Sequence, residues 1–207
     1  AEKSGGLRSY GIGLTKLRKF AKSIKRDAKL ARDLWDSDVY EMKIISLLVD
    51  DPKTFTIERA ETQVEQLHGG YLEHVFSTCD ATLAKTPFVV ELAERWIGSK
   101  DPVRRRCGYG LVYEISKDKR KSAPDEEYFL KHIERIEKSY AKEPTAVLMA
   151  MAGALQGIGM RSKSLNARAL KLALKIGPIE FDPTGKCDPF DVAKNLTSDY
   201  AKKKFGL

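Results

Sequence analysis

Apolar residues recur at the spacing of an α-helix along nearly the whole chain, and this periodicity limits the possible folds more than any other feature. The first stripe of this kind consists of Leu14, Leu17, Phe20, Ala21 and Ile24, continued by Leu30 and Leu34. No convincing run alternates β-branched with polar residues between turn signals, as a half-buried strand would. The chain is therefore predicted to be all-α.

Short helices with tight connections are predicted to follow one another along this pattern. Beyond the first stripe they cover residues 39–49, 57–67, 71–84, 87–97, 102–116, 125–140, 145–158 and 165–176. Two of them begin with N-terminal capping signals, Asp101-Pro102 and Pro124-Asp125. The proline- and glycine-rich residues 177–189 are predicted to be extended, and a short helix is predicted at 191–204.

A degenerate repeat favours stacked helix pairs over a four-helix bundle. An aromatic residue closes a helix and a short acidic turn begins the next one at Trp35 and Asp38, at Trp96 and Asp101, and at Tyr140 and Glu143. The acidic positions are 63 and 42 residues apart, and the second interval fits a HEAT-type period. The sequence predicts an α-solenoid of HEAT-like antiparallel helix pairs with a concave basic face. It also predicts a single domain over residues 1–207, in which residues 1–12 are mobile. Both tryptophans are predicted to pack between repeats.

Positive charge is gathered in blocks, which bears on the kind of partner. The formal net charge is +8, yet residues 1–33 carry ten Lys or Arg against three Asp or Glu, and residues 100–121 carry eight against three. Residues 34–99 carry five against twelve. Blocked positive charge on an ordered domain favours a polyanion such as nucleic acid, although a solvated basic surface has the same composition. An anionic membrane is disfavoured because the basic segments lack an aromatic-rich insertion face.

Several function classes lack the motifs they need. The three cysteines have no CxxC spacing, and His68, His74 and His132 have no second ligand type at a metal spacing. No phosphate loop, dinucleotide fingerprint or nucleophile elbow is present in the sequence. The N-terminal residues lack the apolar region of a signal peptide. We therefore expect a cytoplasmic protein with no metal, no cofactor and no membrane association.

Three groups of residues are candidates for function. Asp80 is expected within an apolar helix, where a carboxylate costs stability unless it is hydrogen-bonded or functional; an ordinary paired helix acid is the alternative. Arg104, Arg105 and Arg106 point about 100° apart on a helix, so at least one should face the inner surface. The third group is residues 10–19, where a glycine turn leads into a basic helix with Thr15 as a candidate cap.

Four stretches of the sequence resemble the bacterial HEAT-like repeat family of alkylpurine DNA glycosylases. They are YGIGLTKLRKFAKSI (10–24), DLWDSDVYEMKIISLLV (33–49), FSTCD (76–80) and ERWIGSKDPVRRRCGYGL (94–111). The resemblance, which covers about residues 7–160, implies binding of double-stranded DNA, including alkylated DNA, and hydrolysis of the N-glycosidic bond of a cationic alkylated purine. It places Asp80 on the family's catalytic aspartate and Arg106 on the arginine that fixes a backbone phosphate beside it. Such a carboxylate would stabilise the oxocarbenium-like sugar.

The chain departs from this family at both aromatic positions of the site. Phe76 stands where the family has a tryptophan, and the family's second tryptophan maps near Gly153. Two functions are therefore predicted: a glycosylase with Asp80 and Arg106 as catalytic residues, or a noncatalytic HEAT-like module that binds unusual DNA structures or a protein partner. In either case the predicted nucleic-acid contacts are Lys16, Arg18, Lys19, Phe76, Arg104 and Arg105.

Overall fold

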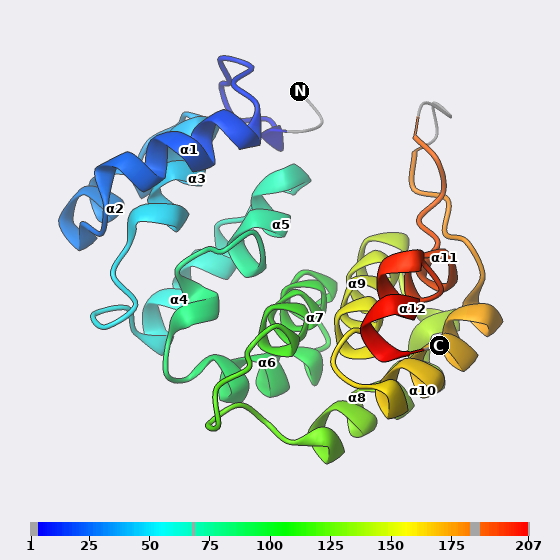
Figure 1. Cartoon of the computed structure of the whole chain (residues 1–207). Helices are drawn as coiled ribbons and strands as arrows, with labels where there is room; N and C mark the ends of the chain where they lie inside the picture. The colour runs from blue at the N-terminus through cyan, green and yellow to red at the C-terminus, as the bar shows by residue number, and fades with distance from the viewer. Residues whose placement is uncertain (1–3, 68, 183–186, 207) are drawn as a thin grey trace. The chain divides into compact units, whose positions relative to one another are not determined.

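The computed structural model describes residues 4–67, 69–182 and 187–206, and it confirms the all-α prediction (Figure 1). Helices make up the regular structure of these residues, and extended pairing is limited to isolated bridges between Arg8 and Val39 and between Ile179 and Phe190. Within the described residues, no helix has both the length and the apolar character required to span a membrane. His68 lies outside the described part of the chain.

The chain divides into two compact units, residues 1–98 and 99–207, and each is described by itself. The single repeat domain expected over residues 1–207 stays a prediction. The helices of the first unit are α1 (Leu14–Ile24), α2 (Ala28–Trp35), α3 (Tyr40–Val49), α4 (Ile57–Glu65), α5 (Gly70–Ser77), η2 (Leu83–Lys85) and α6 (Val89–Ile97). The helices of the second unit are α7 (Pro102–Ser116), α8 (Glu126–Ser139), η3 (Tyr140–Lys142), α9 (Thr145–Gly159), α10 (Lys163–Ile176), α11 (Val192–Leu196) and α12 (Asp199–Phe205).

Most predicted helices are present, and the errors lie at their ends. The prediction for α7 is confirmed at both ends, since Asp101 accepts a hydrogen bond from Val103 N and Pro102 begins the helix. The first apolar stripe is two helices, because the chain breaks at Lys25 with φ 68°. The tail helix is likewise two short helices, separated by a turn in which Ser198 caps α12. Thr15 lies inside α1 and is not its cap, which is Gly13.

The helix pair α2–α3 shows how the first unit is built. Ser46 Oγ donates to Ala31 O at 2.6 Å, and Lys43 Nζ donates to Trp35 O at 2.5 Å, so the two helices run antiparallel. Trp35 is 6% exposed and its Nε1 donates to Gln66 Oε1. The predicted burial of this tryptophan is confirmed, and its polar edge is satisfied as a buried indole requires.

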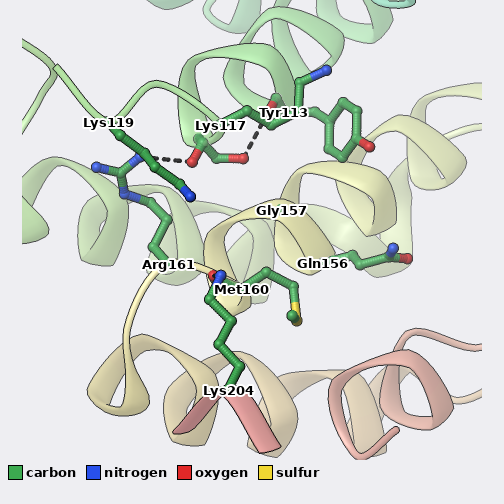
Figure 2. A pocket seen from close by; sticks show the side chains of 9 residues that line it. Tyr113, Lys117, Lys119, Gln156, Gly157, Met160, Arg161 and Lys204 are labelled. Atoms are coloured by element: carbon green, nitrogen blue, oxygen red, sulfur yellow. Dashed lines mark hydrogen bonds between the residues drawn. The ribbon is translucent and has the colours of Figure 1, made fainter. Parts of the chain in front are cut away.

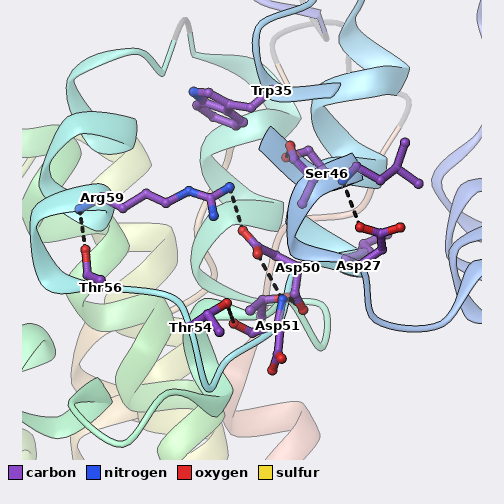
Figure 3. A network of polar contacts seen from close by, with 12 residues as sticks. Asp27, Trp35, Ser46, Asp50, Asp51, Thr54, Thr56 and Arg59 are labelled. Atoms are coloured by element: carbon purple, nitrogen blue, oxygen red, sulfur yellow. Dashed lines mark hydrogen bonds and ion pairs between the residues drawn. The ribbon is translucent and has the colours of Figure 1, made fainter. Parts of the chain in front are cut away.

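The C-terminal end of α3 is a second polar junction of the first unit (Figure 3). Asp50, 1% exposed, pairs with Arg59 of α4 at 2.6 Å between Oδ2 and Nη2. Burial raises the pKa of Asp50, although Arg59 opposes the shift. The Arg59 guanidinium also lies 4.9 Å from the centre of the Phe55 ring. This ion pair therefore joins α3 to α4 where both charges are largely withdrawn from water.

The second unit is built around α7 and α9, which lie side by side (Figure 1). Residues from Cys107 to Val112 of α7 are buried, as are the side chains of Met151 and Leu155 on α9. A Cβ added to Gly157 would lie 2.3 Å from Ser116 Oγ, so the two helices approach closely at their C-terminal ends. Ser116 ends α7, and Gly157 lies near the C-terminal end of α9. Because the C-terminal ends of these two neighbouring helices meet, α7 and α9 run parallel.

We predict that Arg59→Met lowers the free energy of unfolding by about 3 kcal/mol at pH 7, because it leaves the buried Asp50 carboxylate unpaired. The loss should shrink as the pH falls toward 4, since a protonated Asp50 needs no cation. Urea unfolding at both pH values measures this. The double variant Asp50→Asn/Arg59→Met should recover part of the loss at pH 7, and a loss that is independent of pH would contradict the assignment.

Candidate nucleic-acid interface

The segment that leads into α1 is held by one buried carboxylate. Glu41 of α3 is 3% exposed, and its Oε1 accepts hydrogen bonds from Ser9 Oγ at 2.7 Å, Tyr10 N at 3.0 Å and Ile12 N at 3.2 Å. Tyr40 N donates to Arg8 O at 2.9 Å just before this loop. Residues 8–12 are thus anchored by hydrogen bonds, whereas the expected mobility of residues 1–12 stays a prediction; residues 1–3 of that segment lie outside the described residues.

The fixed loop presents an aromatic side chain beside a basic helix. Tyr10 is 66% exposed, and the Arg8 guanidinium lies 6.0 Å from its ring centre. Leu17 and Ala21 bury one face of α1, whereas Lys16 and Lys19 are exposed, and no interaction within the described residues engages either lysine. An amphipathic helix of this kind carries free ammonium groups on its outer face.

Asp80 lies in a turn and not within a helix, which corrects the prediction for 71–84. Helix α5 ends at Ser77, and both Cys79 and Asp80 are left-handed, with φ 58° and 62°. Each costs of order 1 kcal/mol or more, because neither residue is glycine. Thr82 holds the turn in place: its N–H donates to Leu47 O at 2.9 Å and its hydroxyl to Asp50 O at 3.0 Å. The Asp80 side chain is 53% exposed, so it does not carry the cost of a carboxylate buried within an apolar helix.

The Asp80 carboxylate is paired with a residue of the basic helix. Arg18 Nη2 lies 2.5 Å from Asp80 Oδ2, and Lys85 Nζ donates to the Asp80 carbonyl at 2.7 Å. Both Arg18 and Asp80 were predicted from the sequence to be functional residues, and the structure brings them together. One acidic and two basic side chains from three segments therefore surround this turn.

Phe76 is a core residue, whereas the sequence predicted that it contacts nucleic acid. Its ring has no exposed surface and stacks on Trp96 at 5.8 Å between centroids and 29° between planes. Trp96 is 1% exposed, which confirms its predicted burial, and its Nε1 donates to Glu61 Oε1. A ring enclosed in this way has no face left for a sugar or a base.

The arginines of the second unit differ in what they bind. Arg105 is held by Glu143, its Nε and Nη2 donating to the carboxylate while Nη1 donates to Ser99 O and Lys100 O. This guanidinium is occupied inside the protein, so we leave Arg105 out of the interface proposed below. Arg104 Nη1 donates to Asp101 Oδ2 at 3.2 Å, and Arg106 is half-buried early in α7. Asp80 belongs to the first unit and Arg106 to the second.

Glu41 is the organising residue that the sequence analysis missed. The signal was present, because a carboxylate stands at the start of an otherwise apolar helix, YEMKIISLLV. Its three donors lie about 30 residues earlier in the chain, where nothing in the sequence marks them as its partners. A charged residue in an apolar helix indicates a buried polar contact, and here the contact shapes a loop.

The two units and their helix pairs define a HEAT-like repeat protein, and comparison with known structures supports this class. A solved structure described as a new family of proteins related to the HEAT-like repeat DNA glycosylases, with affinity for branched DNA structures, matches with a TM-score of 0.81 and 18% identity. The match covers 99% of this chain and 87% of that chain, and at this identity it shows the fold alone.

The family follows from a second comparison. The model of the DNA alkylation repair enzyme family matches residues 4–178, so the chain belongs to this family, and the resemblance found in the sequence is confirmed. No curated protein sequence matches the chain.

The hydrogen bonds to Glu41 predict a pH effect with a defined sign. Burial raises the pKa of Glu41, but hydrogen bonds from Ser9 and from backbone amides outweigh it, and the pKa lies below its ordinary 4.5. The stabilisation is therefore present above pH 4.5 and is lost as the pH falls through the lowered value. Glu41→Gln should lower the free energy of unfolding by about 2 kcal/mol at pH 7.

Urea unfolding at pH 7 and at pH 3 tests this expectation, and the difference between wild type and variant should be smaller at pH 3. Glu134→Gln is the matched control, since Glu134 is exposed on α8 without a partner in the described part of the chain. Equal losses in the two variants would show that Glu41 is an ordinary surface acid.

Proposed function

We propose that this chain is a DNA-binding protein of the alkylation repair family that recognises unusual DNA structures, branched DNA among them, without excising a base. The observation that carries the DNA contact is the outer face of α1, where Lys16 and Lys19 are free and follow the anchored loop at Tyr10. Free cations on a fixed helix neutralise backbone phosphates and release counterions. Arg104 and Arg106 of the second unit are proposed as further phosphate contacts.

The loop before α1 supports recognition of DNA in which bases are unpaired or ends of stacks are open. The backbone of Tyr10 is fixed by Glu41, so its exposed ring is presented without a further loss of loop entropy. Aromatic rings stack on exposed bases whatever their sequence. Where base stacks end at a branch point, the last bases expose a face, whereas the interior of an intact duplex exposes none.

The residues at the family's aromatic positions disfavour base excision. Phe76 is enclosed in the core, and a Cβ added to Gly153 would meet nothing within 4 Å, so neither of these two residues offers an exposed ring to a sugar. Those rings hold the deoxyribose as positive charge develops on it. Without them, a carboxylate alone has to position the sugar. The solved structure cited above is described as having affinity for branched DNA, which supports the same direction for this chain.

A second candidate, hydrolysis of an N-glycosidic bond, is favoured by the Asp80 turn. An exposed carboxylate on a left-handed turn anchored by Thr82 resembles the strained geometry often found at functional sites. In such a reaction Asp80 would stabilise the cationic sugar, and Arg106 of the second unit would bind a backbone phosphate.

The DNA contact of α1 is tested by Lys16→Gln. We expect weaker binding to a duplex or a branched DNA, and a plot of log affinity against log salt whose slope is smaller by about one phosphate. Fluorescence anisotropy at several salt concentrations measures both quantities. Lys53→Gln is the control, because Lys53 is exposed in the same unit outside α1. Equal effects of the two substitutions would remove α1 from the interface.

Base release from methylated duplex DNA separates the two candidate functions. We expect wild type and Asp80→Asn to release methylated purine at the same background rate, because neither aromatic position supplies a ring to hold the sugar. Chromatography of the released bases measures this. Release by wild type that Asp80→Asn abolishes would contradict our proposal and establish the glycosylase.

A further inference from the structure

A cavity of about 460 Å³ lies within the second unit, at the C-terminal ends of α7 and α9 (Figure 2). This size falls in the range of cavities that hold small ligands or parts of larger ones. Four cationic side chains line it: Lys117 and Lys119 follow α7, Arg161 follows α9, and Lys204 comes from α12. Three segments that are distant in the sequence thus bring positive charge to one hollow.

The walls of the cavity are held by hydrogen bonds between the helix ends. Arg161 Nη1 donates to Ser116 O at 2.6 Å and to Asp118 O at 2.8 Å, which ties the end of α9 to the end of α7. Lys204 Nζ donates to Met160 O at 2.6 Å and ties α12 to α9. The cavity is therefore part of the folded unit and does not depend on a mobile loop.

The carboxylates near the cavity already have cationic partners, one of which is the lining residue Lys117. Glu114 Oε2 lies 2.5 Å from Lys117 Nζ, and the Asp118 carboxylate accepts hydrogen bonds from Nε and Nη2 of Arg120. Lys119, Arg161 and Lys204 form no ion pair within the described residues. Three positive charges around the hollow thus have no ion-pair partner among the described residues.

The donors that face the cavity suit an anion with several oxygens. Arg161 is half-buried, and burial lowers its pKa although Asp118 opposes the shift, so an anion would compensate its lost hydration. Lys204 uses one ammonium N–H on Met160 O and has two others. Gln156 Oε1 accepts from Asn195, which leaves the Gln156 amide N–H group as a donor. Phosphate matches such a mixed set of guanidinium, ammonium and amide donors.

We infer that this cavity binds backbone phosphate of a second DNA segment when the protein holds branched DNA; this inference rests on the function proposed above. Helix α7 has 15 residues, so its two ends lie about 22 Å apart. Arg104 and Arg106 lie near one end, and the cavity lies at the other. Phosphates of one strand are about 3.4 Å apart along the helix axis, so the two places bind well-separated phosphates. A branched DNA offers two duplex segments that leave one point in different directions.

The test uses the full chain with a labelled four-way junction and with a linear duplex of the same arm sequence. The variant is Lys119→Gln/Lys204→Gln, which removes two charges that have no ion-pair partner in the described residues and keeps Arg161, whose guanidinium holds α7. Lys163→Gln/Lys171→Gln is the control, because both lysines are exposed on α10 outside the cavity. We expect the cavity variant to bind the junction about tenfold more weakly, with a salt slope smaller by about two phosphates, and to bind the duplex within about twofold of wild type. Thermal unfolding verifies that both variants are folded.

Each other outcome has a definite meaning. Unchanged junction binding, or equal losses on junction and duplex, would overturn the assignment of the cavity to a second segment. If wild type binds neither DNA, the proposed function itself fails, and that result is distinct from failure of the cavity alone. Titration with inorganic phosphate, followed by NMR of the Arg161 and Lys119 resonances, shows whether the cavity binds free phosphate. Saturable shifts together with unchanged junction binding in the variant would assign the cavity to free phosphate and overturn the DNA assignment.

Discussion

Helix α3 arranges the first unit through the polar groups at its two ends. At its start, the buried Glu41 carboxylate fixes the loop that leads into α1. At its end, carbonyl groups without helical partners accept hydrogen bonds from two other segments, as helix ends require. Arg26 Nη1 donates to Leu48 O and Asp50 O, while the N–H of Thr82 donates to Leu47 O. The basic helix and the Asp80 turn are thus both set against one apolar helix, and their meeting at the Arg18–Asp80 pair follows from this arrangement.

The sequence predicted elements better where local chemistry decides them than where distant segments do. Both ends of α7 were predicted, because Asp101-Pro102 caps it locally. The end of α5 was missed, since Cys79 and Asp80 are left-handed without being glycine and are held there by Thr82 against the end of α3. Apolar periodicity continued through this turn, because Ala81 and Leu83 are buried as helical residues would be. The burial of Ala81 and Leu83 was therefore predictable, whereas the backbone direction of the turn and the exposure of Asp80 were not.

The candidate site, too, was predictable where local helix geometry determines it and was not predictable where distant segments meet. Lys16 and Lys19 could be assigned to an outer face from the apolar stripe of α1 alone, since helical geometry fixes which residues oppose Leu17 and Ala21. Phe76 could not be separated from a ligand contact, because a buried ring and a ring in an active site occupy the same apolar positions in sequence. Its stacking on Trp96, 20 residues later in the chain, places the ring in the core. The cavity in the second unit depends on three segments and was beyond sequence reasoning altogether.

Net charge identifies an interface only after the cations that pair with carboxylates inside the protein are removed. In the basic block at residues 100–121, Arg105 is bound to Glu143 and Lys117 to Glu114, so part of that block stabilises the fold. Cations at the C-terminal ends of helices also interact favourably with the helix dipole, which gives Lys204 a role without any ligand. The cations without a carboxylate partner argue for binding of an anion. They are Lys119, Arg161 and Lys204, which surround a hollow whose neighbouring carboxylates are already paired with other cations. Capping explains why one cation sits at each helix end, whereas it does not explain the gathering of three unneutralised charges around one cavity.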